Sequence, residues 1–257
     1  MKYMGSKARI AKDIEPIITM WLTNNRYYVE PFSGGMNMMC NINHDKRLAS
    51  DKNNYLIAMW RYVIRNTELF PRKIPKDLYS KYRDKFNEIG FYGMGETFEE
   101  AMIGWIGFMG SFNGRFFDGG HSGHDVKGRD YIGEQIRNTL SQVDKMKNVW
   151  FTCGKYNEIY IPDNSVIYCD PPYQDTKQYS TSKNFNHNSF WEWCRQKTKD
   201  GNDVLISEYQ APQDFVCIWG KKVTNAMSTN NTYKPTEKLF VHESIADKYM
   251  YNELKLL

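Results

Sequence analysis

Apolar residues recur along the chain in two spacings, one typical of amphipathic helices and one of short buried strands. Helical spacing runs from Lys7 to Leu22, where Pro16 is expected to disturb it, and again from Asn53 to Ile64. Short apolar runs predict six strands, namely Tyr27–Val29, Arg47–Ser50, Ser165–Cys169, Asp203–Ser207, Phe215–Trp219 and Lys238–His242. The last two are expected to form a hairpin. Strands that alternate with helices predict an α/β fold with a doubly wound sheet.

Residues 68–144 differ in character from the segments on either side. They begin with Lys- and Arg-rich helical sequence at Arg72–Phe86 and continue into a loop rich in glycine and aromatic residues at Gly107–Asp125. We therefore expect residues 1–67 and 145–257 to form one catalytic domain. Residues 68–144 are predicted to be a mostly helical insertion on one edge of its sheet.

Composition and charge limit the classes of function. The chain has 257 residues, 34 basic against 30 acidic side chains, a formal net charge of +4 and 15% aromatic residues. This mild basic excess in a foldable composition permits a nucleic-acid partner without requiring one. Since no apolar run approaches the ~20 residues of a membrane span, and the start MKYMGSKARI has no apolar signal region, we expect no membrane association. The scattered cysteines, without a CxxC pair, predict neither a disulfide scaffold nor a metal site.

The first candidate site is the glycine turn that follows the strand Tyr27–Val29. The sequence from Glu30 to Gly35 leads into a predicted helix start at Met36–Cys40. Glycines let the backbone approach a ligand where a Cβ atom would collide, and Asp51, which ends the next strand, suits the hydroxyl groups of a ribose. Because GxGxxG is absent, the pattern favours a nucleoside cofactor without a diphosphate, such as S-adenosylmethionine. A plain strand-to-helix turn is the alternative.

The second candidate site is Asp170–Pro171–Pro172–Tyr173, directly after the apolar strand Ser165–Cys169. Two prolines after a strand end both helix and strand pairing, and they fix an extended turn. The Asp170 carboxylate and the proline carbonyl groups are hydrogen-bond acceptors. The turn therefore suits gripping an amino group while the Tyr173 ring stacks on the plane that carries it. The alternative is that the prolines only end the strand.

Five segments of the sequence resemble the Dam-like DNA adenine methyltransferases. They are KYMGSK (Lys2–Lys7), VEPFSGG (Val29–Gly35), ASDKN (Ala49–Asn53), YCDPPYQDT (Tyr168–Thr176) and VLISEY (Val204–Tyr209), and they follow the order of the family's α class. The resemblance implies a Rossmann-like methyltransferase sheet, S-adenosylmethionine as cofactor and double-stranded DNA as partner.

The resemblance also implies roles for individual residues. Tyr3 and Lys7 would contact the cofactor, with Lys7 at its methionine carboxylate; the alternatives are a packed terminus for Tyr3 and a solvated helix start for Lys7. The implied cofactor-binding set is Tyr3, Lys7, Glu30, Pro31, Phe32, Ser33, Gly34, Gly35, Asp51 and Asp170. The implied catalytic set is Asp170, Pro171, Pro172 and Tyr173.

The chemistry of an aryl amine explains why such a turn would be catalytic. The exocyclic nitrogen of adenine is a poor nucleophile because its lone pair is delocalised into the ring. Acceptors at Asp170 and the Pro171 carbonyl would bind its two hydrogens and favour the pyramidal nitrogen of the transition state. The base must leave the duplex to reach them, so we expect it to be flipped out and stacked on Tyr173, under a lid formed by residues 174–186. The alternative for these residues is a surface loop that is disordered without DNA. No metal is required.

The insertion is the predicted target-recognition region. Its basic run would contact phosphates, with a solvated helix face as the alternative. In the segment Ser111–Phe117 we expect a hairpin that reads base edges and wedges exposed aromatic rings into the base stack; the alternative is a loop that packs Phe116 and Phe117 into a local core. The predicted DNA-binding residues, the lid residue included, are Lys73, Lys76, Asn113, Arg115, Phe116 and Tyr179.

The predicted function is site-specific methylation of DNA adenine at N6. N4-cytosine and RNA adenine methylation are alternatives, because the same acceptors bind any ring amine. An alternative of another class is a sequence-specific DNA-binding protein that has lost catalysis. We expect a monomer, with a dimer on DNA as the alternative, in the cytoplasm of a bacterium or encoded by a phage or mobile element. A companion restriction endonuclease, as in restriction-modification, is a further partner that the resemblance allows.

Overall fold

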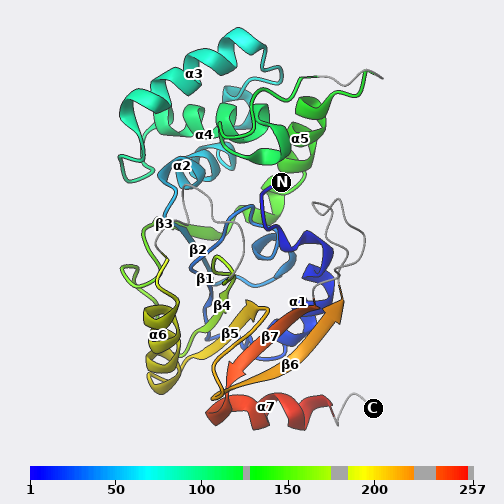
Figure 1. Ribbon diagram of the computed structural model, residues 1–257, viewed down its shortest axis with the longest axis vertical. Coiled ribbons are helices and arrows are strands. Elements are labelled where there is room, and N and C mark those ends of the chain that lie inside the picture. Colours follow the sequence, from blue (N-terminus) through cyan, green and yellow to red (C-terminus); the bar gives the residue numbers. More distant parts are fainter. Residues whose placement is uncertain (124–127, 175–184, 223–235, 254–257) are drawn as a thin grey trace. The chain divides into compact units, whose positions relative to one another are not determined.

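The chain folds as a mixed α/β protein with a seven-stranded sheet in the order β3-β2-β1-β4-β5-β7-β6 (Figure 1). The computed structural model describes residues 1–123, 128–174, 185–222 and 236–253. They form two compact units: Met1–Met20 with Phe32–Ile159, and Trp21–Pro31 with Tyr160–Leu257. The predicted α/β class is confirmed.

The first unit holds two parallel strands and most of the helices. Strand β2 (Arg47–Asp51) pairs in parallel with β3 (Val149–Cys153). Helix α2 (Asn54–Val63) follows β2 because the Asn53 side chain accepts a hydrogen bond from the Leu56 N–H at 3.2 Å and so caps the first turn. This unit also contains helix α1 (Ala11–Thr19). Its short 3₁₀ turns are η1 (Lys7–Arg9), η2 (Met39–Asn41), η3 (Thr67–Leu69), η4 (Phe112–Gly114) and η5 (Val143–Met146).

Residues 68–144 lie within this first unit and are mostly helical, as predicted. Helices α3 (Lys76–Ile89), α4 (Phe98–Gly110) and α5 (Tyr131–Leu140) make up the α-helical part of the segment that the structure describes. Helix α4 packs against α2 and α3 (Figure 1). A Cβ atom on Gly104 would lie 2.1 Å from the Tyr55 carbonyl oxygen of α2, so glycine is what allows these two helices their close approach. That the segment is a domain of its own stays a prediction.

Three sequence predictions in the first unit are wrong in detail. Helix α3 begins at Lys76 and not at Arg72, because Pro75 has extended backbone and stands at its N-cap. Gly107–Gly110 is the last turn of α4 and not a loop, since its glycines make room for neighbouring side chains. No α-helix starts at Met36: its φ is +57°, which breaks the helix, and the 3₁₀ turn η2 follows instead.

The second unit contains the other five strands. Its strands are β1 (Tyr28–Glu30), β4 (Val166–Cys169), β5 (Asp203–Glu208), β6 (Phe215–Lys222) and β7 (Thr236–His242). The pairs β1–β4 and β4–β5 are parallel, whereas β7 is antiparallel to both β5 and β6. The predicted closing hairpin is thereby confirmed.

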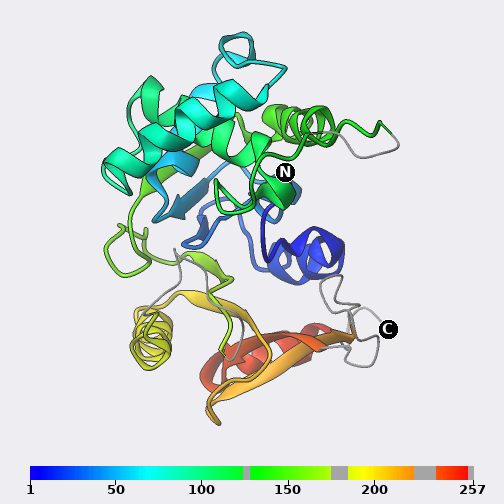
Figure 2. The same cartoon turned by 45° about the horizontal axis from the view of Figure 1, so that its top comes forward.

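Two helices accompany these strands. Helix α6 (His187–Lys199) packs on β5 and β7, and α7 (Glu243–Glu253) packs on the hairpin of β6 and β7 (Figure 2). A buried ion pair fixes the segment before β1: the Arg26 guanidinium lies 2.6 Å from Asp203, whose other oxygen is 2.9 Å from the Lys248 ammonium. Of the helices in the described residues, none has the length and apolar character to cross a membrane.

Candidate active site

In the first unit, the glycine turn is pinned to the end of β2. The Ser33 backbone N–H and side-chain hydroxyl both donate to the Ser50 carbonyl, at 2.9 and 2.8 Å. Gly34 has a φ of +46°, a left-handed conformation that suits glycine, and its N–H donates to Asp51 Oδ2 at 3.0 Å. The two predicted cofactor segments of this unit are therefore joined by direct hydrogen bonds.

The Asp51 carboxylate is oriented by backbone groups. Its second oxygen accepts the Asn53 N–H at 2.9 Å. Burial raises the pKa of Asp51 above its ordinary value, and the N–H donors of Asn53 and Gly34 act in the opposite direction. An ionised carboxylate accepts about four hydrogen bonds, so Asp51 keeps capacity for hydroxyl donors such as those of a ribose.

Tyr3 lies directly against the glycine turn. A Cβ atom on Gly34 would be 2.9 Å from the Tyr3 ring, and one on Gly35 would be 2.6 Å from the Tyr3 Cβ. The Tyr3 ring also contacts Phe108 of α4, with ring centres 5.8 Å apart. The glycines, predicted to make room for a ligand, make room for this tyrosine.

The amino-terminal segment is anchored on two sides. The Asn37 amide, just after the glycine turn, donates to the Met1 carbonyl at 3.1 Å and to Ser6 Oγ at 2.8 Å. On the other side, Gln135 of α5 accepts the Lys2 N–H at 3.1 Å and donates to the Lys2 carbonyl at 2.9 Å. Neither Asn37 nor Gln135 was among the site residues predicted from the sequence. The segment thus links the glycine turn to the predicted insertion.

The first unit supplies groups that fit S-adenosylmethionine chemically. Asp51 is an acceptor for hydroxyl groups. Lys7 is buried, with 8% of the residue exposed, and its ammonium group is a cation that suits a carboxylate. Phe32 stacks on Tyr156, with ring centres 5.4 Å apart, and offers an aromatic surface for a purine. Tyr156 was missed because no strand was predicted at β3. It follows the end of β3 just as Asp51 ends β2, and this shared position is the signal that could have found it.

In the second unit, the Asp-Pro-Pro-Tyr turn follows β4, as predicted. Tyr173 is buried at 8% exposure, and its hydroxyl donates to Glu237 Oε2 of β7 at 2.7 Å. Its ring meets Tyr209 edge to face, with centres 4.7 Å apart. Burial, followed by the charges of Asp170 and Glu237, raises the pKa of Tyr173 well above its usual range, so the hydroxyl remains a donor.

A buried carboxylate ties this turn to the neighbouring strand end. Glu208, at 2% exposure, ends β5 and accepts the Gln174 N–H at 3.1 Å and the Tyr209 N–H at 2.7 Å. Glu208 and Tyr209 belong to the VLISEY segment, which carried the resemblance but received no role. Glu237 was missed altogether.

Glu30 ends β1 in the same unit and is also buried. It is 2% exposed, and Oε1 accepts a hydrogen bond from the Tyr28 hydroxyl at 2.7 Å. Pro31, which follows it, is buried too. A carboxylate at this position can accept more than one hydrogen bond.

The predicted DNA-binding loop has one packed side and one exposed side. Phe116 and Phe117 were predicted to be exposed, but both are half-buried. The Phe116 ring lies 4.7 Å from that of Phe108 and 5.0 Å from that of Phe86, and Phe117 stacks on Phe86 at 5.6 Å. These rings form a local core, which was the alternative to a hairpin that wedges into DNA. Both residues have positive φ, 36° and 63°, which bulky residues rarely adopt and which this packing sustains.

The exposed side carries Phe112 and Asn113. Phe112 is 46% exposed, and Asn113 is exposed with a φ of +53°. Arg115, two residues on, is half-buried. Lys76, the first residue of α3, and Lys73, shortly before it, are both exposed. Tyr179 and the rest of the predicted lid up to residue 184 lie outside the described residues.

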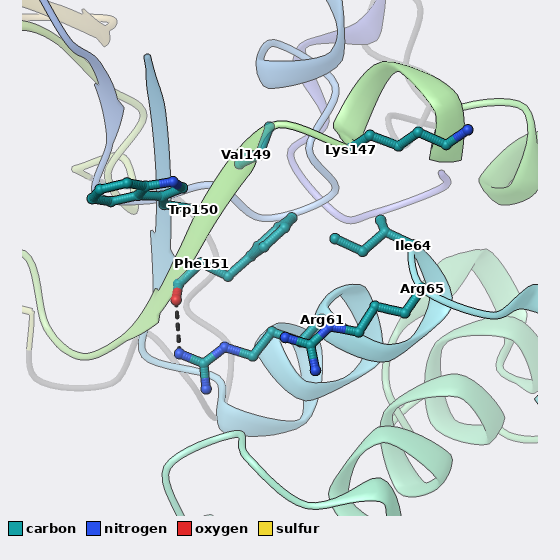
Figure 3. A pocket seen from close by; sticks show the side chains of 7 residues that line it. All are labelled: Arg61, Ile64, Arg65, Lys147, Val149, Trp150 and Phe151. Atoms are coloured by element: carbon teal, nitrogen blue, oxygen red, sulfur yellow. Dashed lines mark hydrogen bonds between the residues drawn. The ribbon is translucent and has the colours of Figure 1, made fainter. Parts of the chain in front are cut away.

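A pocket of about 490 Å³ opens elsewhere in the first unit, between α2 and β3 (Figure 3). The Arg61 guanidinium crosses it and donates to the Phe151 carbonyl at 2.7 Å, which fixes the helix to the strand. Its lining residues are Arg61, Ile64, Arg65, Lys147, Val149, Trp150 and Phe151. None of the predicted site residues is among them.

Comparison with known proteins assigns the family. The profile described as D12 class N6 adenine-specific DNA methyltransferase matches residues 3–106 and 123–248. The chain therefore belongs to this family, and the resemblance stated above is confirmed.

Two curated relatives illustrate the similarity. The DNA adenine methylase of Vibrio cholerae is 26% identical over 206 residues, which cover 72% of this chain and 67% of the relative. The type II methyltransferase M.FokI of Planomicrobium okeanokoites is 25% identical over 218 residues, 80% of this chain. The chain spans only 33% of the length of M.FokI.

Among solved structures, an rRNA methylase from Streptococcus thermophilus aligns over 92% of this chain and 96% of its own, at 8% identity and a TM-score of 0.37. A likeness at this score supports no conclusion about fold or function. The fold is defined by the strand order and pairing described above.

Proposed function

We propose that the protein transfers a methyl group from S-adenosylmethionine to the exocyclic N6 amine of an adenine flipped out of double-stranded DNA, at a specific sequence. Family membership supports adenine in DNA as the target. The observation that carries the proposal is the Asp-Pro-Pro-Tyr turn at the end of β4, where Tyr173 is held by Glu237.

Asp170 is the central residue of the proposed chemistry. Its carboxylate would accept one hydrogen of the adenine amine, and the Pro171 carbonyl would accept the other. Both acceptors favour the pyramidal nitrogen whose lone pair is free to attack, so they stabilise the transition state more than the bound substrate. The methylated amine must lose one proton, and the carboxylate already hydrogen-bonded to that hydrogen is the group placed to take it.

The aromatic and acidic groups around this turn have binding roles in the proposal. The Tyr173 ring would stack on the flipped adenine and hold its amine in the plane of the acceptors. S-adenosylmethionine supplies the methyl group on a positively charged sulfur. In the first unit, Asp51 would bind its ribose, Lys7 its carboxylate and the Phe32–Tyr156 pair its purine.

The target-recognition role is assigned to the exposed side of residues 68–144. Asn113 and Phe112 would contact bases, because both side chains are exposed at the same turn. Lys73 and Lys76 would contact phosphates. Phe116, which was predicted to wedge into DNA, is assigned instead to the core that supports the loop.

The cellular setting is also proposed. We infer that the enzyme acts on DNA in the bacterial cytoplasm, whether encoded by the host or by a phage. The M.FokI relative, a type II methyltransferase, favours a second proposal, that a companion restriction endonuclease cuts the same sequence.

The proposal is tested by replacing Asp170 with Ala. Methyl transfer from labelled S-adenosylmethionine to unmethylated DNA should fall below detection, while cooperative thermal unfolding is preserved. Transfer at the wild-type rate would reject Asp170 as a catalytic residue. A wild-type protein that binds DNA but neither binds S-adenosylmethionine nor transfers methyl groups would favour the DNA-binding protein that has lost catalysis.

A further inference from the structure

The hydroxyl of Tyr173 is held by a carboxylate from a distant part of the second unit. The acceptor, Glu237 Oε2, lies 2.7 Å away and 64 residues along the chain, on β7. Strand β7 is antiparallel to β5, with Glu208 opposite Lys238, so the sheet register brings Glu237 to the end of β5. The bond therefore joins the turn after β4 to a paired strand of the sheet.

A second contact limits the ring from the side. Tyr209 meets the Tyr173 ring edge to face, at an angle of 83° between the ring planes. Tyr209 is itself fixed, because its N–H donates to the buried Glu208 carboxylate at 2.7 Å. The other oxygen of Glu208 accepts the N–H of Gln174, the residue after Tyr173. The neighbouring backbone, the ring and the hydroxyl of Tyr173 are thus all restrained.

A restrained ring is preorganised for stacking on a base. A tyrosine ring turns about two side-chain bonds, and a base stacks well on it in a narrow range of orientations. A hydrogen bond from a neutral hydroxyl to a carboxylate is charge-assisted and stronger than one between neutral groups. Such a bond at the far end of the ring removes most of its freedom before the base arrives, which is the preorganisation that catalysis rewards.

We propose that Glu237 is a positioning residue for methyl transfer, which holds the Tyr173 ring in the orientation that stacks on the target base. Tyr209 supports the same orientation by contact. The inference rests on the proposed function, in which Tyr173 is the stacking residue. Glu237 touches neither the methyl donor nor the amine in this account and acts through Tyr173.

The test is a double-mutant cycle on the full chain, with steady-state methyl transfer to unmethylated DNA as the readout. Glu237→Ala and Tyr173→Phe remove the two partners of one hydrogen bond. Each should lower kcat about tenfold, the effect expected of one charge-assisted bond. The double variant should be no slower than the slower single variant, because the bond can be lost only once. Glu237→Gln, whose amide oxygen still accepts, should retain most of the activity.

Binding measurements separate positioning from general damage. S-adenosylmethionine affinity, by calorimetry, and the unfolding midpoint should change little in Tyr173→Phe, which removes a single oxygen atom. Glu243→Ala, a change at an exposed glutamate at the start of α7, is the matched control and should behave as wild type.

The inference is overturned if Glu237→Ala keeps the wild-type kcat. It is also overturned if Tyr173→Phe keeps full kcat while Glu237→Ala loses activity together with cofactor binding or folding, because the role of Glu237 would then be structural. Failure of the proposed function looks different: the wild-type protein itself would transfer no methyl group to DNA.

Discussion

The Cβ of Tyr3 occupies the space that a Cβ atom on Gly35 would need, at 2.6 Å from its ideal position. The amino-terminal segment therefore packs directly against the glycine turn and fills the space beside it. Tyr3 and the turn form one surface, and a change in either alters the other.

Gly35→Ala tests this relationship. The new methyl group would collide with Tyr3 and with Asn37 Nδ2, 2.8 Å away, so the amino-terminal segment must shift. We expect stability to fall by about 1–3 kcal/mol, as for overpacking, and S-adenosylmethionine affinity to fall at least tenfold. Calorimetry and urea unfolding measure both.

Gly220→Ala is the matched control for this change. The nearest atom to its Cβ would be 3.6 Å away, and the residue is exposed in β6. Both quantities should stay at wild-type values. If Gly35→Ala binds S-adenosylmethionine as tightly as Gly220→Ala does, the turn has no part in cofactor binding.

The two sides of the predicted DNA loop should respond differently to mutation. Phe116→Ala removes a ring packed among Phe86 and Phe108 and should cost ~3 kcal/mol of stability. Phe112→Ala removes a ring that is 46% exposed and should change stability by less than about 0.5 kcal/mol. In methylation assays Phe112→Ala should raise KM for DNA several-fold. Equal KM values for Phe112→Ala and wild type would remove Phe112 from the DNA interface.

The exposed lysines of α3 and the residues before it predict a salt effect. Lys73→Ala and Lys76→Ala should each weaken DNA binding at low salt. Each should also reduce the slope of log K against log salt concentration by about 0.9 for one lost phosphate contact. Fluorescence anisotropy with a labelled duplex at several salt concentrations measures this slope. Lys199→Ala, on the exposed surface of α6, is the control. Slopes that match the control would mean that these lysines face only solvent.

The buried Glu100 predicts how stability depends on pH. Burial alone would raise its pKa, but hydrogen bonds from the Asn54 amide and the N–H groups of Thr97 and Gly95 outweigh it, so the pKa lies below its ordinary 4.5. A depressed pKa means that the folded state holds the proton less tightly than the unfolded state. The stabilisation is therefore complete above pH ~4.5 and is lost as the pH falls through the folded-state pKa.

Glu100→Gln should remove this part of the pH dependence. Thermal unfolding between pH 7 and pH 3 should show a smaller loss of Tm for the variant than for wild type, from a lower starting value. Glu99→Gln, at the exposed neighbouring position, should keep the wild-type profile. Identical profiles for wild type and Glu100→Gln would contradict a contribution of Glu100 to the pH dependence of stability.

Much of the fold was predictable because its central strands are buried apolar runs that end at distinctive residues. Strand β4 is buried throughout and is followed directly by Asp170, and β2 ends at Asp51, both as predicted. Strand β3 was missed because it carries Trp150 at 66% exposure and lacks the apolar continuity of a central strand. In the insertion, Gly107 and Gly110 were predicted to lie in a loop, but both belong to α4, where they allow the close approach of neighbouring side chains.

The candidate site was predictable only where it is local in sequence. The Asp-Pro-Pro-Tyr turn and the glycine turn are each one continuous stretch of sequence, so their residues could be named in advance. Glu237 lies 64 residues from Tyr173, and the pairing of β7 with β5 decides that the two meet. The packing of Phe116 likewise depends on Phe86 of α3. No pattern in either segment alone contains that information.

The most direct test of the account is the identity of the methylated nucleoside. Purified protein, S-adenosylmethionine and unmethylated bacterial DNA are incubated, the DNA is digested, and the nucleosides are separated and identified by mass spectrometry, with an RNA substrate in parallel. The account predicts N6-methyldeoxyadenosine from DNA, none from RNA, and none with Asp170→Ala. N4-methyldeoxycytidine as the product, methylation of RNA in place of DNA, or no methylated nucleoside would contradict it.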